Sequence, residues 1–178
     1  AARLLTMAAI QNSSAALAEI LKAAEQGDLA AQSSLGYVYY KRFWNENYPE
    51  ALHWLRKAAD QGDPKAHYYL GLMYAFGQGV EKDYTEAVRL IRHAAEQGVA
   101  EAQYKLGSAY RDGDAYNNGK WVKKDPAEAA RWFRKAARQK YASAYADLGL
   151  IYYTGEGATK DFSEALFWFR KSVRHMGF

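Results

Sequence analysis

Two short motifs recur along the chain at matching intervals, and this periodicity constrains the fold more than any other feature. The pair Leu-Gly begins at Leu35, Leu70, Leu106 and Leu148, at spacings of 35, 36 and 42 residues. The string Ala-Ala-x-Gln-Gly begins at Ala23, Ala58 and Ala94 and degenerates at Ala136, with the same three spacings. Two independent markers that move in step indicate an internal repeat, in which each unit buries its apolar face against its neighbours.

Each unit predicts two helices. In the second unit, Asp63-Pro64 marks a helix start, because Asp caps free amides and Pro fits the first helical position. Ala66, Leu70 and Tyr74 follow at a spacing of four residues and therefore share one helical face. A glycine after the leucine costs about 1 kcal/mol of helix propensity. Its recurrence predicts close helix packing at a place where no side chain fits.

The second helix of each unit has its own start and stop signals. An Asp three residues before a Glu is a capping-box-like pattern, and it occurs at Asp83/Glu86, Asp125/Glu128 and Asp161/Glu164, with Asn47/Glu50 as a variant. Gly27, Gly62 and Gly98 stand where left-handed C-caps would end these helices.

The repeat period predicts an all-α chain of about four helix-turn-helix units, each 35–42 residues long, plus an N-terminal helix. We expect a single repeat domain over residues 1–178. Its expected parts are a partial leading repeat at 1–27 and complete repeats at 28–62, 63–98, 99–140 and 141–178, with a loop insertion at 112–124 in the third.

Composition excludes several classes of protein. Apolar residues make up 49% and charged residues 25% of the 178 residues, which are ordinary globular values. The net charge of +4 is mild, and its basic residues lie on helices beside glutamates, as on a solvated outer face rather than a nucleic-acid footprint. There is no cysteine, and no apolar run reaches the length of a membrane span. Exported, periplasmic and cytoplasmic locations all stay open.

The repeat unit resembles a known family. Its pattern is Ala-x-x-x-Leu-Gly-x-x-Tyr, then Gly-x-Gly-Val-x-x-Asp-x-x-x-Ala, then Arg-x-Ala-Ala-x-x-Gly, and it is similar to the Sel-one-like repeat, a branch of the tetratricopeptide repeat superfamily. Residues 63–98 match nearly throughout, and the array covers residues 12–178. The resemblance implies a right-handed α-solenoid that serves as an adaptor or scaffold, often in bacteria and often exported.

The glycine pair Gly77-Gln78-Gly79 recurs in register as Gly155-Glu156-Gly157. A dinucleotide-binding fingerprint would need a preceding strand and a third glycine, and the sequence offers neither. We therefore interpret these glycines as connectors between the two helices of a repeat.

One face of the first helices is the candidate binding surface. Residues two before, two after and five after each leucine point away from the core, and several are aromatic or apolar. The resemblance implies that first helices line the concave wall of the solenoid, where tyrosine is well suited to a peptide or protein. The alternative is that these side chains pack between neighbouring repeats. The predicted partner-binding residues are Tyr37, Tyr40, Tyr68, Leu72, Tyr104, Arg111, Leu150 and Tyr153.

Three positions have more specific expected roles. Arg111 would pair with an acidic group on the ligand, and Trp121 in the insertion would form a loop contact or simply pack. Phe167 stands where other repeats carry His53, Arg89 or Arg131, which suggests an end-cap or self-association contact. The insertion loosely imitates a calcium loop but lacks the final bidentate Glu, so we predict no metal site.

No set of residues in the sequence predicts catalysis. The four histidines stand at unrelated repeat positions, and the recurring carboxylates are explained as helix caps. We therefore predict a non-enzymatic protein–protein interaction scaffold, without a cofactor, whose partner is another protein or peptide. Two alternatives stay open: an immunity protein that inhibits a toxic enzyme, and a cell-envelope regulator that binds peptidoglycan or another glycan.

Overall fold

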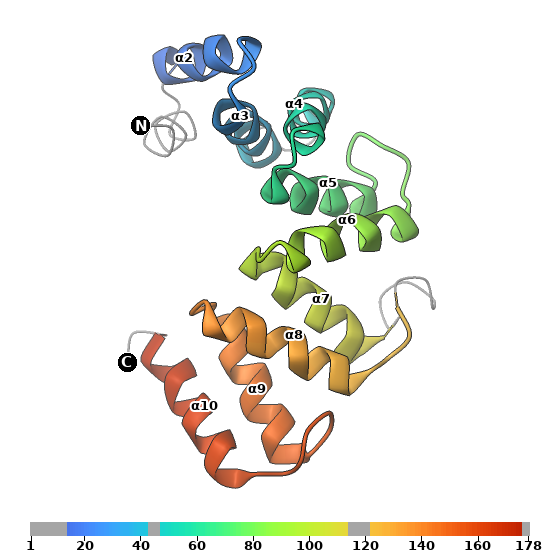
Figure 1. The fold of residues 1–178 in the computed structure, drawn as a ribbon, viewed down its shortest axis with the longest axis vertical. Helices are drawn as coiled ribbons and strands as arrows, with labels where there is room; N and C mark the ends of the chain where they lie inside the picture. Colours follow the sequence, from blue (N-terminus) through green and yellow to red (C-terminus); the bar gives the residue numbers. More distant parts are fainter. Residues whose placement is uncertain (1–13, 43–46, 114–121, 176–178) are drawn as a thin grey trace. The chain divides into compact units, whose positions relative to one another are not determined.

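The structure, a computed structural model, describes residues 14–42, 47–113 and 122–175. Every regular element within these ranges is an α-helix (Figure 1). The predicted all-α architecture of helix-turn-helix units is confirmed. The chain divides into two compact units, residues 1–93 and residues 94–178.

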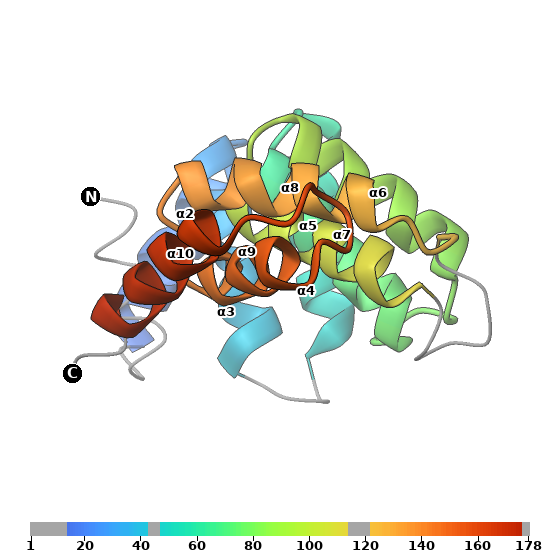
Figure 2. The ribbon, with the colours of Figure 1, turned by 90° about the horizontal axis from the view of Figure 1, so that it is seen from below.

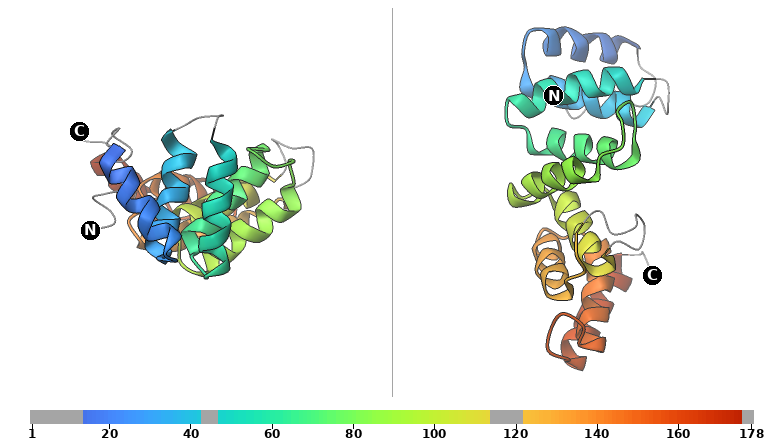
Figure 3. Two further views of the ribbon diagram at one scale, coloured as in Figure 1. Left: turned by 90° about the horizontal axis from the view of Figure 1, so that it is seen from above. Right: turned by 90° about the vertical axis from the view of Figure 1, so that its right-hand side faces the viewer.

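Unit one, residues 1–93, is built from successive antiparallel helices that each pack on the next. α3 packs between α2 and α4, and α4 also packs on α5. These helices are coloured from dark blue to green in the right-hand view of Figure 3. The helices are α2 (Ser14–Glu25), α3 (Leu29–Arg42), α4 (Tyr48–Asp60), α5 (Pro64–Phe76) and the part of α6 (Tyr84–Glu96) up to His93.

Unit two, residues 94–178, repeats the same arrangement. α8 packs between α7 and α9, and α9 packs on α10, which lies beside it in Figures 1 and 2. After the last turn of α6, the helices are α7 (Ala100–Asp112), α8 (Pro126–Arg138), α9 (Ser143–Thr154) and α10 (Phe162–His175).

Aspartates cap the helices as predicted. The Asp63 carboxylate accepts hydrogen bonds from the backbone N–H groups of Lys65 and Ala66, at 2.7 and 3.2 Å, and Pro64 occupies the first turn. Asp83, Asp125 and Asp161 cap α6, α8 and α10 in the same way. Each cap supplies an acceptor for amides that have no partner inside the helix.

The glutamates of the expected capping boxes do something else. Glu86 and Glu128 do not reach back to the cap residue but form ion pairs with Arg89 and Arg131, at 2.6 and 2.7 Å along their own helices. Glu164 accepts a hydrogen bond from the Trp168 indole. A partner one turn onward is available on the exposed face in each case. The backbone N–H of each cap residue already donates to a carbonyl of the preceding helix, so the glutamates do not close a reciprocal box. Asn47 precedes α4 without a side-chain cap.

The predicted left-handed C-caps are confirmed. Gly62 ends its helix at φ +86° and Gly98 at φ +91°, a region that favours glycine because it has no Cβ. Lys140 occupies the same repeat position at φ +64°. The backbone therefore keeps the left-handed turn there, although the residue is a lysine and not a glycine.

The glycine of each Leu-Gly pair lies against a large side chain of the second helix in the same repeat. A Cβ added at Gly71 would lie 2.6 Å from Ile91 Cγ1, and one at Gly36 would lie 2.6 Å from Leu55 Cγ. Phe133 and Phe169 fill the same place against Gly107 and Gly149. Because the leucine before each glycine is buried, this close approach closes the core between the two helices.

Paired glutamines connect three successive helices. In unit one, buried Gln32 of α3 donates to the Ala24 carbonyl at the end of α2 and accepts from Gln61, just after α4, at 2.7 Å. Gln103 and Gln139 repeat these bonds in unit two, with Ala95 in the place of Ala24. The inward amides are therefore satisfied, as buried polar groups must be.

We expect Gly71→Ala to lower the free energy of unfolding by about 1–3 kcal/mol, because overpacking against Ile91 outweighs the better helix propensity of alanine. Urea unfolding followed by circular dichroism measures the change. The double variant Gly71→Ala/Ile91→Ala should lose less stability than the sum of the losses in the two single variants. Full additivity would contradict the proposed contact.

Candidate functional site

Four tyrosines from α3 and α5 form a cluster in unit one. The ring of Tyr69 lies 5.1 Å from Tyr37, 5.4 Å from Tyr40 and 5.2 Å from Tyr68, measured between centroids. The rings are tilted by 42–56°, a favourable arrangement for aromatic pairs. All four side chains are half-buried, so each presents part of its ring to solvent. We call these four residues the tyrosine cluster.

The surroundings of Tyr40 affect the ionisation of its hydroxyl. Burial, followed by the neighbouring Tyr48, raises the pKa of the Tyr40 hydroxyl above its usual 10.0. Burial and Glu50 likewise raise the pKa of Tyr39, the preceding residue of α3. These hydroxyls stay protonated at neutral pH, so they remain hydrogen-bond donors as well as acceptors.

Leu72 lies at the repeat position of Tyr37 but differs from it. Its side chain is buried, as is that of Ala75, which stands at the position of Tyr40. Here the structure favours the alternative interpretation, in which an outward position of the first helix becomes core. Leu72 therefore offers little surface to a partner.

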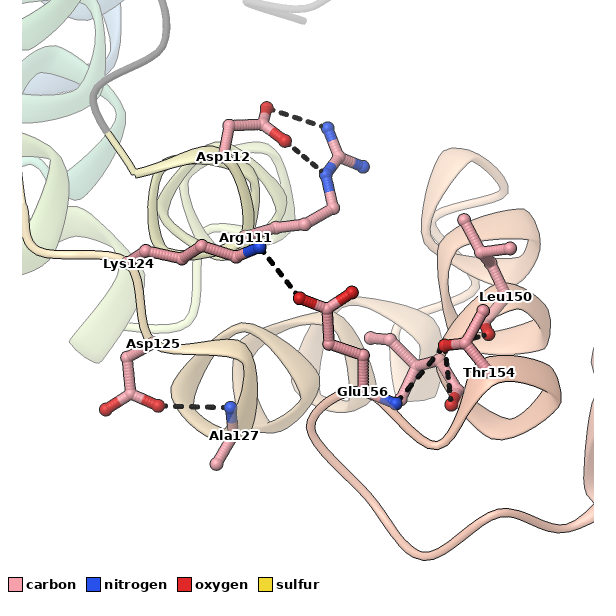
Figure 4. A network of polar contacts seen from close by, with 9 residues as sticks. Arg111, Asp112, Lys124, Asp125, Ala127, Leu150, Thr154 and Glu156 are labelled. Carbon is pink, nitrogen blue, oxygen red and sulfur yellow. Dashed lines mark hydrogen bonds and ion pairs between the residues drawn. The ribbon is translucent and has the colours of Figure 1, made fainter.

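In α7 of unit two, the repeat position of Tyr40 carries a charged residue, Arg111. The Arg111 guanidinium at the end of α7 forms two parallel hydrogen bonds with the Asp112 carboxylate, at 2.6 and 2.9 Å (Figure 4), and a third with Asp147 of α9. Tyr104, one of the predicted contact residues, lies 5.2 Å from Tyr141 and 5.5 Å from Phe133 between ring centroids. An acidic ligand group would have to compete with both aspartates for Arg111.

Burial and charge pairing shift the pKa values of the ionisable side chains around Arg111. It raises the pKa of the Asp147 carboxyl, although Arg111 and a hydrogen bond from Tyr104 act in the opposite direction. Burial and the Asp147 charge raise the pKa of Tyr104, and the hydrogen bond with Asp112 raises that of Arg111. Burial also lowers the pKa of Lys105 on the same helix. Arg111, Asp112 and Asp147 thus pair their opposite charges with one another.

The loops of the last two repeats are joined by an ion pair. Lys124 Nζ lies 2.7 Å from Glu156 Oε1, between the segment before α8 and the glycine loop after α9 (Figure 4). Both side chains are more than half exposed, so the pair contributes little to stability. Trp121, the predicted loop contact, lies outside the described residues.

Leu150, Tyr153 and Phe167 are all exposed. Phe167 is held edge-on to Trp168 at 5.0 Å, and the Lys171 ammonium lies 4.6 Å from its ring. Successive residues turn by about 100° around a helix, so Phe167 faces a different direction from its neighbour Leu166. Its role in self-association stays a prediction.

The wheel reasoning missed Tyr69 and Asp147. Both stand one residue before the leucine, a position that it did not treat as outward, and both contact the preceding first helix. The sequence shows that this position carries a large or charged side chain at Tyr69, Lys105 and Asp147, but not that these side chains reach the preceding first helix.

Other kinds of site are not indicated. Within the described ranges, no group of three or more His, Asp or Glu side chains is placed to hold a metal ion. In the same part of the chain, no helix has both the length and the apolar character needed to cross a bilayer.

Comparison with known proteins fits this repeat geometry. A profile of the Sel1 repeat matches residues 29–63, 64–99, 100–141 and 142–175. The chain belongs to the Sel1 repeat family. The resemblance drawn from sequence is therefore confirmed, together with the expected fold class, an all-α solenoid of helix-turn-helix repeats. Sel1 repeats generally form protein-interaction scaffolds.

Solved Sel1 repeat structures share this fold. A protective antigen present in uropathogenic Escherichia coli strains, which displays an SLR fold, has 37% identity and a TM-score of 0.77, over 89% of this chain and 33% of that one. A Sel1 repeat protein from Oxalobacter formigenes has 35% identity and a TM-score of 0.77, over 90% and 63%. The present chain thus spans about one third of the length of the Escherichia coli protein and less than two thirds of the length of the Oxalobacter formigenes protein.

An immunity protein from Pseudomonas aeruginosa shares the fold alone, at 19% identity and a TM-score of 0.50 over 97% of this Sel1 repeat chain and 81% of that protein. Comparison with curated proteins gives no match.

We expect the stability of the protein to fall as the pH rises above about 10, because unfolded tyrosines ionise there while half-buried Tyr40 resists ionisation. A raised folded-state pKa gives stability that is present below the unfolded value and is lost above it. Tyr40→Phe should make this fall shallower, as measured by urea unfolding at pH 8, 10 and 11. Identical slopes for wild type and variant would contradict the assignment.

Proposed function

We propose that this Sel1 repeat protein is a non-enzymatic scaffold that binds another protein or a peptide on the outward face of its first helices. The tyrosine cluster carries the proposal. It combines four partly exposed rings, fixed against one another by contacts of 5.1–5.4 Å, with hydroxyl groups that accept and donate hydrogen bonds. Such surfaces bind an apolar side chain at little cost in side-chain entropy, because the rings are already ordered.

The equivalent face of unit two has a different character. Tyr104 adds aromatic surface there, whereas Arg111, Asp112 and Asp147 satisfy one another. Charged groups that are already paired add selectivity rather than affinity, because a partner must match their fixed arrangement. The ligand is therefore expected to place its apolar side chains on the tyrosine cluster.

The other functions predicted from sequence, inhibition of a toxic enzyme and binding of peptidoglycan or another glycan, remain predictions. The likeness to an immunity protein is a likeness of fold. Aromatic rings also stack on sugars, so the tyrosine cluster by itself does not separate a glycan from a peptide.

The double variant Tyr37→Ala/Tyr68→Ala should lose at least about tenfold in affinity for the native partner, because aromatic anchors dominate such interfaces. The experiment captures proteins from the native cell with immobilised wild type, identifies them by mass spectrometry, and then measures each purified candidate by calorimetry. Peptidoglycan fragments are measured alongside.

Tyr84→Ala is the matched control, because Tyr84 is also a half-buried tyrosine but begins the second helix α6. Circular dichroism confirms that all variants remain helical. A partner that binds the double variant as tightly as wild type would refute the tyrosine cluster as the site, and binding of peptidoglycan fragments alone would refute the protein-ligand proposal.

A further inference from the structure

Exposed apolar side chains gather on the last two helices. Within the described ranges, nine large apolar side chains are exposed, and seven of them lie on α9 and α10. Phe162, Leu166, Phe169 and Val173 of α10 follow one another at intervals of four, three and four residues, which places them on a single stripe of the helix. Such a concentration of exposed apolar surface marks an interaction site.

The stripe on α10 joins two exposed residues of α9. The Phe162 ring meets the Tyr153 ring edge-on at 5.8 Å, and Leu150 lies one turn before Tyr153 on the same helix. We call Leu150, Tyr153, Phe162, Leu166, Phe169 and Val173 the end face.

The same positions are buried in α4, the second helix of the first complete repeat. Phe162, Leu166 and Phe169 are 61%, 50% and 37% exposed. Their counterparts in α4, namely Tyr48, Leu52 and Leu55, are 7%, 6% and 0% exposed. The difference lies in the following helix, because α5 packs its Ala66, Leu70 and Met73 against α4 in one core cluster. In unit two, α9 covers Ala130 and Ala137 of α8 in the same manner.

The glycine loop of the following repeat completes each of these contacts. A Cβ added at Gly79 would lie 2.7 Å from Tyr48 Cβ and 3.1 Å from Leu52 Cδ1. Gly157 lies just as closely over the Pro126 carbonyl at the start of α8. The second glycine of Gly-x-Gly thus lets the loop rest on the first turn of the preceding second helix, at the position that Phe162 occupies in α10.

The first-helix side of the end face has a counterpart as well. Tyr69 of α5 stacks on Tyr37 and Tyr40 of α3, and Leu150 and Tyr153 stand at those two repeat positions in α9. Every part of the end face therefore corresponds to a surface that a following repeat covers elsewhere in the chain.

We propose that the end face is a docking surface for one more Sel1-type helical hairpin. Its first helix packs on α10 as α5 packs on α4, and its Gly-x-Gly loop covers Phe162 as Gly79 covers Tyr48. The required chemistry is specific: an alanine and leucine stripe on the incoming helix, and a glycine where the loop crosses Phe162.

The test adds such a hairpin. In the chimera, residues 62–98 follow His175 directly, which keeps the repeat register because Gln61 and His175 stand at the same repeat position. The thermal midpoint of the chimera should exceed that of the wild type. Leu166→Glu should shift the wild-type midpoint by less than about 2 °C, because the side chain is exposed, and should lower that of the chimera by about 5 °C or more.

Phe167→Glu is the matched control. It introduces the same charge one residue away, at a position that is exposed in α6 and α8, and it should shift both midpoints equally. A second chimera with residues 140–175 in place of 62–98 repeats the comparison with a different first helix, should the first one fail to fold.

Two results would overturn the proposal. One is an equal effect of Leu166→Glu on the wild type and both chimeras. The other is a wild-type dimer in analytical ultracentrifugation that Leu166→Glu dissociates, because a second copy would then be the occupant of the end face. A monomeric wild type together with a chimera-specific loss supports it.

Discussion

The contact between a helical glycine and one large side chain sets the distance between the two helices of every repeat. Gly36, Gly71, Gly107 and Gly149 meet Leu55, Ile91, Phe133 and Phe169, so the second helix approaches the first without an intervening Cβ. Helices this close bury the leucine and alanine faces between them and leave other faces for the neighbouring repeats. The positions that can bind a partner follow from this geometry.

The repeat period made most of the fold predictable, because markers such as Leu70-Gly71 and Asp63-Pro64 fix both the helices and their register. The site was less predictable. A helical wheel describes one helix against its own core, whereas Leu72 is buried and Tyr69 reaches a tyrosine of the preceding repeat. Likewise the sequence singled out Phe167 as an apolar residue at an outer position, although the larger exposed stripe on α10 runs from Phe162 through the neighbouring Leu166. Contacts between repeats depend on stacking geometry that a single helix does not encode.

The scaffold and the surface vary independently in this chain. The glycine contacts and aspartate caps recur with little change, while the outward positions change from the rings of the tyrosine cluster to the ion pairs of Arg111. The recurring contacts are made by buried residues, so substitutions at the outward positions change the surface at small cost to folding.

The paired glutamines hold neighbouring helices in register. Gln32 and Gln61 belong to opposite ends of one repeat, yet their amides meet beside the last turn of the helix before it. Loss of Gln61 would leave the buried Gln32 oxygen without this partner, at a penalty of about 1–3 kcal/mol. Other repeats carry a glutamine at the position of Gln61, namely Gln26, Gln97 or Gln139, so an exchange of these second helices in register would preserve the bond.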